Sequence, residues 1–145
     1  MKKSLLQKIA WAYAVAFFLI FLLNYAPGVH DENGLMFGLF KLDPIDDAVH
    51  IVSAIWAAIA GAISFRQSQI YFKVFGIFYF TDGILCTLVG QCLLDFTIFT
   101  YAHSATIIQS SNFMERLLPN IPHLVVGGFA FLLGFYLSKR PRFRQ

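Results

Sequence analysis

Four long apolar segments constrain the fold more than any other feature of this chain. Helices of about 20 apolar residues are long enough to cross the roughly 30 Å hydrocarbon core of a bilayer. Because lipid offers peptide groups no hydrogen bonds, such segments must satisfy their own backbone as helices. The sequence therefore predicts an all-α membrane protein, a four-transmembrane-helix bundle forming one domain over residues 1–145. The expected spans are 9–26, 48–65, 74–94 and 121–137, with outer loops 27–47 and 95–120.

The composition agrees with this class. Charged residues make up 13% of the chain and hydrophobic ones 58%, whereas about a quarter of a soluble domain is charged. The first segment follows a basic start, "MKKSLLQK", as a signal peptide would. Its "NYA" end is a poor cleavage site, so we expect it to be retained as the first span.

The charges predict the orientation. Nine of the eleven basic residues flank the ends that the positive-inside rule places in the cytoplasm. Seven of the eight acids fall in the two outer loops. A multi-pass protein of the bacterial inner (cytoplasmic) membrane is expected, with both termini cytoplasmic. The basic tail "KRPRFRQ" is explained by this topology and by anionic lipid, so the bilayer is the expected partner and nucleic acid is not.

Small residues recur at helical spacing in every span, which predicts close helix packing, since lipid gives apolar helices no hydrophobic reason to associate. A tight bundle is expected; association into a homo-oligomer or a larger membrane complex stays open. The small residues are Ala10, Ala12, Ala14 and Ala16; Ala54, Ala57, Ala58, Gly61 and Ala62; Gly76, Gly83 and Gly90; and Gly127 and Gly134.

An internal repeat relates the second span to the fourth. "HIVSAIWAAIAG" from His50 aligns without gaps on "HLVVGGFAFLLG" from His123, with the His, a Val, an Ala and the last Gly identical. The repeating unit would be a two-span hairpin used twice in parallel orientation. The repeat places His50 and His123 at the same depth, one turn below the outer surface.

The stretches "GLMFGLFKLDPIDDAVHIVSAIWAAIAG" and "LPNIPHLVVGGFAFLLG" resemble a bacterial four-span inner-membrane family that is known only as a domain of unknown function. In that family a Gly- and Phe-rich outer loop and a polar pair precede a His at the start of span two, and a similar His begins span four. The resemblance implies the fold and the topology. It supplies no substrate, and the long 95–120 loop departs from the pattern.

The residues around the two histidines allow three interpretations. Asp46 and Asp47 stand four and three residues before His50, so either carboxylate can share its helical face. Asp46, Asp47, His50 and His123 could hold a metal ion, or His50 and His123 could hold the iron of a haem b between spans two and four. Alternatively, Asp46 or Asp47 caps the second span, Asn120 caps the fourth, and the histidines pack at the bundle's outer end.

Asp82 is expected near the bilayer midplane, where a charge costs at least about 2.5–3.5 kcal/mol. We expect a neutral Asp82 bonded to a hydroxyl and acting either as a proton-relay group or as polar glue between helices. The candidate hydroxyls belong to Ser53, Ser64, Tyr13 and Tyr79.

The two cysteines, Cys86 and Cys92, lie six residues apart on one expected helix. They would therefore point in different directions and remain free, buried thiols.

Catalytic motifs are absent from the sequence: it contains no HExxH, no GxSxG and no phosphate-binding glycine loop. Ser104 beside His103 implies no ordered base. "GLMFGLF" from Gly34 and "NFMERLL" are expected to lie at the outer membrane surface. We therefore expect a non-enzymatic membrane protein with a binding or assembly role. The alternative is a cofactor- or ion-handling protein, using a metal, a bis-His haem, or Asp82 as a proton-coupled carrier.

Overall fold

The computed structural model describes residues 3–38, 41–100 and 112–144, so His103 and Ser104 lie outside the described residues. Four long helices form an all-α bundle, and each is long and apolar enough to cross a membrane. They are α1 (Leu5–Leu23), α2 (Pro44–Ile63), α3 (Phe65–Val89) and α5 (Phe113–Phe135). Three short helices complete the described chain: α4 (Thr97–Thr100), η1 (Leu137–Lys139) and α6 (Pro141–Arg144). The predicted fold class is confirmed.

All four long helices begin earlier in the chain than expected, because polar caps rather than hydropathy set their starts. The Asp43 side chain accepts hydrogen bonds from two backbone N–H groups of the first turn of α2, and the Asp43 N–H donates to the Asp46 carboxylate. Asn112 caps α5 in the same role, so "NFMERLL" belongs to this helix and is not a separate surface segment. The expectation that Asp46 or Asp47 and Asn120 would be the caps is therefore wrong.

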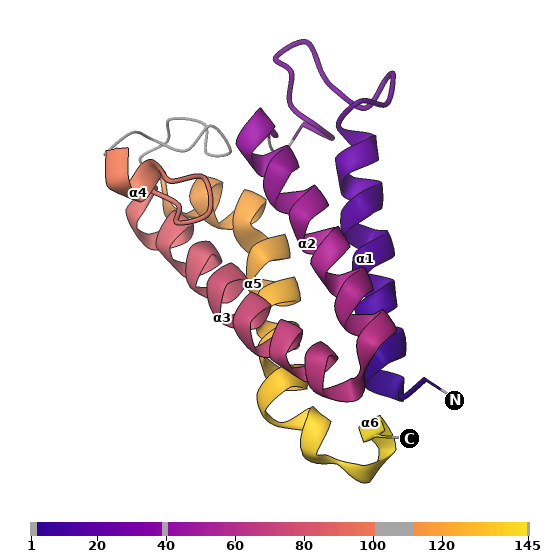
Figure 1. Ribbon diagram of the computed structural model, residues 1–145. Helices are drawn as coiled ribbons and strands as arrows, with labels where there is room; N and C mark the ends of the chain where they lie inside the picture. The colour runs from indigo at the N-terminus through magenta and orange to yellow at the C-terminus, as the bar shows by residue number, and fades with distance from the viewer. Residues whose placement is uncertain (1–2, 39–40, 101–111, 145) are drawn as a thin grey trace.

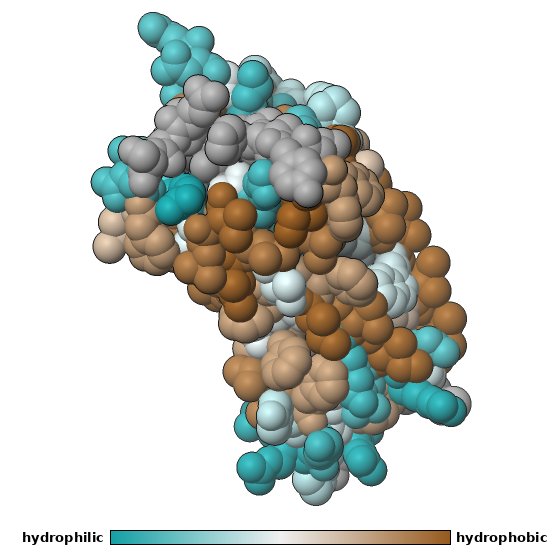
Figure 2. All heavy atoms as spheres, turned by 90° about the vertical axis from the view of Figure 1, so that its left-hand side faces the viewer, coloured by the Kyte–Doolittle hydropathy of each residue, from teal (hydrophilic) through white to brown (hydrophobic). Residues whose placement is uncertain are grey.

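The helices form two pairs, α1 with α2 and α3 with α5 (Figure 1). Ser64 joins the pairs, since it both ends α2 and caps α3. Both ends of the chain lie at one end of the bundle (Figure 1). The opposite end carries the described parts of the two other connections, residues 24–38, 41–43 and 90–100, and we call it the loop end (Figure 1). Figure 2 shows a hydrophobic band on one face, between hydrophilic ends. This surface is compatible with a multi-pass membrane protein.

Glycines bring α3 and α5 into backbone contact, as the small-residue pattern predicted. A Cβ atom on Gly127 would lie 2.5 Å from the backbone nitrogen of Phe80, and one on Gly134 would lie 2.6 Å from that of Lys73. Gly76 faces Phe131 across the same interface. Gly90, expected in this seam, instead ends α3 in a left-handed conformation with φ 78°.

The α1–α2 interface uses small residues on one face of each helix. Ala10 and Ala14 are buried on α1, and Ala54, Ala57 and Gly61 are buried on α2. Ala12, Ala16 and Ala62 are exposed. Aromatic rings fill the space between the two helix pairs, with Tyr13, Phe17 and Phe75 within 6.2 Å of one another between ring centroids. Tyr13 also donates a hydrogen bond to the Val126 carbonyl at 3.0 Å, which ties α1 to α5.

We expect Gly127→Ala to lower the free energy of unfolding in detergent by about 1–3 kcal/mol, because the added methyl group overpacks a backbone–backbone contact. Gly128→Ala is the matched control, since its Cβ would meet only the Phe80 ring, at 3.4 Å. Unfolding by sodium dodecyl sulfate, followed by circular dichroism, measures both variants. Equal stability of the two would contradict the close α3–α5 contact.

Candidate functional site at the loop end

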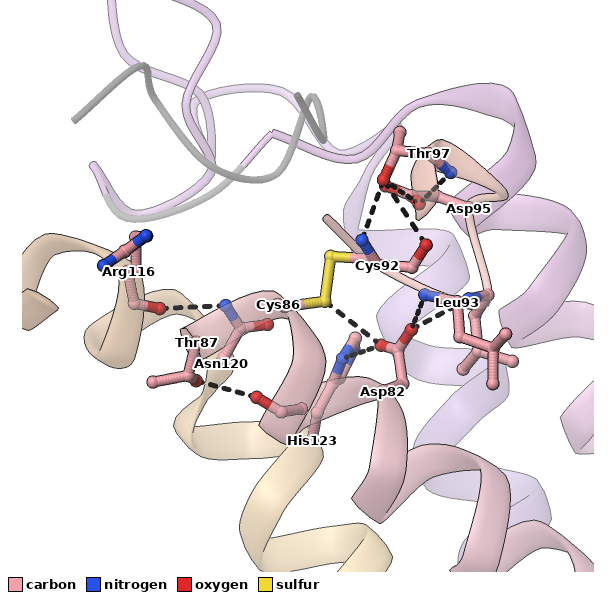
Figure 3. A network of polar contacts seen from close by, with 12 residues as sticks. Asp82, Cys86, Thr87, Cys92, Leu93, Asp95, Thr97, Arg116, Asn120 and His123 are labelled. Carbon is pink, nitrogen blue, oxygen red and sulfur yellow. Dashed lines mark hydrogen bonds and ion pairs between the residues drawn. A yellow bond between two sulfur atoms is a disulfide. The ribbon is translucent and has the colours of Figure 1, made fainter. Parts of the chain in front are cut away.

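Asp82 organises the polar residues of the loop end. It lies on α3 seven residues before the helix ends at Val89, and it is 1% exposed. Beyond Gly90 the chain turns back, so the N–H groups of Leu93 and Leu94 donate to Asp82 Oδ1 at 2.7 and 2.8 Å. Nδ1 of His123, on α5, lies 2.9 Å from Asp82 Oδ2 (Figure 3). The expectation of a hydroxyl partner for Asp82 is therefore wrong.

Cys86 and Cys92 form a disulfide with a Cα–Cα distance of 4.6 Å, so the expectation of free thiols is wrong. That expectation assumed one continuous helix, whereas Gly90 reverses the chain and brings Cys92 back over the last turn of α3. Cys86 Sγ lies 3.6 Å from Asp82 Oδ2. In the disulfide this sulfur carries no proton, so the contact becomes a hydrogen bond only when the thiol is restored.

Asp95 and Thr97 hold the reversed segment in place. The Cys92 N–H donates to Thr97 Oγ1 at 2.8 Å, and the Thr97 hydroxyl donates to Asp95 Oδ1 at 2.7 Å (Figure 3). Asp95 also accepts from the Thr97 N–H at 2.9 Å, at the start of α4. The turn after Gly90 is thus held by hydrogen bonds to Asp82 of α3 and to the side chains of Asp95 and Thr97.

His50 lies on α2 and is 6% exposed, with its ring stacked on Phe17 of α1 at 5.7 Å between centroids. Its buried Nδ1 atom forms no hydrogen bond of ordinary geometry among the described residues, although the Asp46 backbone lies nearby, and the same holds for the Tyr79 hydroxyl beside Ser53. The Tyr79 ring meets the His123 ring edge-on at 5.1 Å. His50, Tyr79 and His123 therefore gather at one place, from three helices.

These three residues line two adjoining cavities. The larger has a volume of about 160 Å³, and its other walls are apolar. The residues of these walls come from α1, from α5 and from the connection between α1 and α2: Phe17, Ile20, Leu23, Met36, Phe37, Leu42, Pro119, Pro122 and Val126. The smaller, of about 10 Å³, is also lined by Asp82, Cys92 and Asn120. That volume holds one water molecule or one ion. Asn120, whose Oδ1 atom is buried and without a hydrogen bond within the described chain, is one of the lining residues.

Asp47 lies apart from the other residues of the predicted metal set. Its two carboxylate oxygens accept from the Asn24 side chain at 3.0 Å, and Oδ2 also accepts from the Tyr25 hydroxyl at 2.6 Å. These bonds tie the end of α1 to the start of α2, and the bond to Asp47 raises the pKa of the Tyr25 phenol. Asp46, His50 and His123 do line one cavity, the smaller one.

A haem b between His50 and His123 would need more room than the structure provides. The cavity that both residues line measures about 160 Å³, whereas sites for drug-sized ligands measure roughly 300–1,000 Å³. Haem is larger than most such ligands. The site fits a smaller occupant.

Sequence reasoning missed the disulfide and the Asp82–His123 pair. One signal was available, because Gly90 followed by the polar Gln91 is a typical helix end. A helix ending there places Asp82 near the loop end and lets Cys92 return toward Cys86. Nothing in the sequence indicated that Asn24 and Tyr25 would bind Asp47.

No protein-family model matches the chain, and neither does any curated protein or any solved structure. The function is therefore inferred from the geometry of the loop end alone.

We expect the unfolded, non-reduced protein to take up no maleimide, because both cysteines of the chain form the disulfide. After treatment with a reductant it should take up two equivalents, read as a mass shift. Cys86→Ser should take up one equivalent without any reductant. Two equivalents in the non-reduced wild type would contradict the disulfide.

We expect Asp82→Ala to destabilise the protein by at least about 2 kcal/mol, because two buried N–H groups lose their acceptor. Asp82→Asn is the matched control, since its amide oxygen still accepts from both N–H groups and its NH₂ faces His123. The free energy of unfolding in detergent distinguishes the two. Asn and Ala variants of equal stability would show that the turn does not depend on Asp82.

Proposed function

We propose that this protein is a multi-pass membrane protein that binds a small, largely apolar ligand at its loop end, without turnover. One observation carries the proposal: an apolar cavity of about 160 Å³ has its polar wall formed by His50, Tyr79 and His123, and two of these side chains keep a buried polar atom without a well-formed hydrogen bond. Buried polar atoms without partners are costly, so an occupant that pairs with them is favoured.

The proposed location is the bacterial inner membrane, with both termini in the cytoplasm. The distribution of basic residues supports this orientation, which places the loop end outside. An outward-facing disulfide agrees with it, because disulfides persist in oxidising compartments and are rare in the cytoplasm. Two further proposals rest on the same sequence patterns: the parallel repeat of the two hairpins, and membership of the four-span family that the chain resembles.

The cavity, which is partly open at the surface, has room for about one six-membered ring. A dry cavity of about 150 Å³ in another protein binds benzene, and this one is of similar volume. The smaller cavity adjoins it at His50, Tyr79 and His123. A ring in the larger space can therefore direct one polar substituent toward these side chains.

The polar wall favours an oxygen substituent on that ring. The Tyr79 hydroxyl can donate to it, and a ring nitrogen of His50 can donate or accept according to its tautomer. Phenols and ring carbonyl compounds have this chemistry.

A proton-coupled role for Asp82 is a second candidate. The observation that favours it is the 2.9 Å contact between Asp82 and His123, which joins two titratable groups across α3 and α5.

We expect wild-type protein in detergent micelles to bind phenol saturably, as measured by titration calorimetry. Ile20→Trp should abolish this binding, because the larger ring fills the cavity from α1. Leu19→Trp is the matched control, since Leu19 is exposed on the same helix and lines neither cavity. Equal binding by the two variants would contradict the proposed site.

The polar wall is tested separately with His50→Phe, which keeps a ring against Phe17. We expect it to weaken phenol binding about fivefold, the equivalent of about 1 kcal/mol for one lost hydrogen bond, and to leave benzene binding unchanged. If both ligands lose affinity equally, the hydrogen-bonding part of the proposal fails while the cavity itself stands.

A further inference from the structure

We propose that reduction of the Cys86–Cys92 disulfide creates a zinc site whose four ligands are Cys86, Cys92, Asp82 and His123. This site differs from the metal set expected from the sequence, with which it shares only His123. It shares His123 with the polar wall of the ligand cavity, but the two proposals are tested separately, because zinc binding requires the reduced protein and phenol binding does not.

The ligand atoms already lie close together. One oxygen of Asp82 and the two sulfur atoms lie within 4.8 Å of one another, and among the described residues no other group of three or more His, Cys, Asp or Glu side chains is this close. His123 Nδ1 adds a fourth atom, 2.9 Å from Asp82 Oδ2 (Figure 3). Two sulfurs, one nitrogen and one oxygen form a donor set typical of tetrahedral zinc.

Asp82 and the two cysteines require only small movements, whereas the His123 ring, which lies outside their 4.8 Å group, must move closer to the sulfur atoms. In a tetrahedral site with bonds of about 2.0–2.3 Å, neighbouring ligand atoms lie roughly 3.3–3.8 Å apart. The Cys86 Sγ–Asp82 Oδ2 distance is 3.6 Å and already falls in this range. The Asp82–His123 contact must open by about half an ångström, and the two sulfurs must separate once their bond is broken.

The surroundings of the four residues also suit an ion. The cavity of about 10 Å³ beside Asp82, Cys92 and His123 holds one ion or water. Asn120 Oδ1, 0% exposed and without a partner in the described chain, lines this same cavity. The N–H groups of Leu93 and Leu94 fix the other oxygen of Asp82, as groups behind a metal ligand commonly do.

The redox step balances with a dithiol as reductant. Its two thiols pass two electrons and two protons to the disulfide, so the S–S bond breaks, Cys86 and Cys92 become thiols, and the donor becomes a disulfide. Zinc then displaces both thiol protons, which pass to solvent. Transfer of two electrons from the thiolates to a disulfide oxidant re-forms the bond and releases the ion. The loop end would thus alternate between a metal-free oxidised state and a zinc-bound reduced state.

The test compares oxidised and reduced full-length protein in detergent, with the reductant removed under anaerobic conditions. We expect the reduced protein to bind one equivalent of Zn²⁺ at least tenfold more tightly than the oxidised protein. Co²⁺ should give the thiolate-to-metal absorption band in the reduced protein alone. Equal zinc binding in both states, or no cobalt–thiolate band in a folded reduced protein, would overturn the proposal.

Two histidine variants identify the ligands. We expect His123→Ala to weaken zinc binding by the reduced protein at least tenfold. His50→Ala should leave it unchanged, because His50 lines the same small cavity without being a ligand. A loss of affinity in His50→Ala with none in His123→Ala would overturn the assignment.

If the reduced protein unfolds without metal, added Zn²⁺ should restore its helical circular dichroism spectrum, since an ion that binds the folded state stabilises it. Under the same conditions Zn²⁺ should not restore the helical circular dichroism spectrum of the Cys86→Ser variant. Failure of zinc to restore the reduced wild type would equally overturn the proposal.

Discussion

The carboxylate of Asp82 is the interaction on which the loop end depends. Where a helix ends within an apolar bundle, the backbone N–H groups of the residues that follow have neither water nor another backbone segment to hydrogen-bond. Each such group is costly to leave unpaired. Asp82 accepts two of them, from Leu93 and Leu94, and with its other oxygen it contacts His123. Gly90 ends α3, and one side chain of this helix, Asp82, then holds the returning chain and contacts α5.

The position of the cavities follows from the packing of the helix pairs. Glycines let the backbones of α3 and α5 touch, while α1 and α2 meet through alanines and Gly61. Between the pairs the rings of Tyr13, Phe17, Phe75 and Tyr79 take up the space. Nearer the loop end, His50 and His123 lie next to these rings. Two small cavities remain beside the histidines. His50 Nδ1 and the Tyr79 hydroxyl, two of the buried polar atoms without a well-formed hydrogen bond, thus lie where the rings leave space unfilled.

Hydropathy and spacing were sufficient to predict four membrane-spanning helices and their close packing through small residues, because both depend on periodic properties of a helix. The loop end depends on where the helices stop, and single residues decide that. Asp43 and Asn112 start α2 and α5 before their apolar runs begin. Gly90 stops α3 inside an apolar run, which no average over a window can detect. Every error about Cys86, Cys92 and Asp82 follows from extending α3 past this glycine.

The two histidines that the proposed repeat pairs have different surroundings, and the difference gives them different chemistry. Each contacts the first helix of its own hairpin. His50 meets the ring of Phe17 on α1, whereas His123 meets the carboxylate of Asp82 on α3. A carboxylate fixes the tautomer and orientation of an imidazole, which suits a metal ligand or a proton-transfer pair. A phenyl ring fixes its orientation alone and leaves the nitrogens free to bond an occupant of the cavity. If the hairpins arose by duplication, one histidine kept or acquired a polar partner and the other became a contact for a ligand.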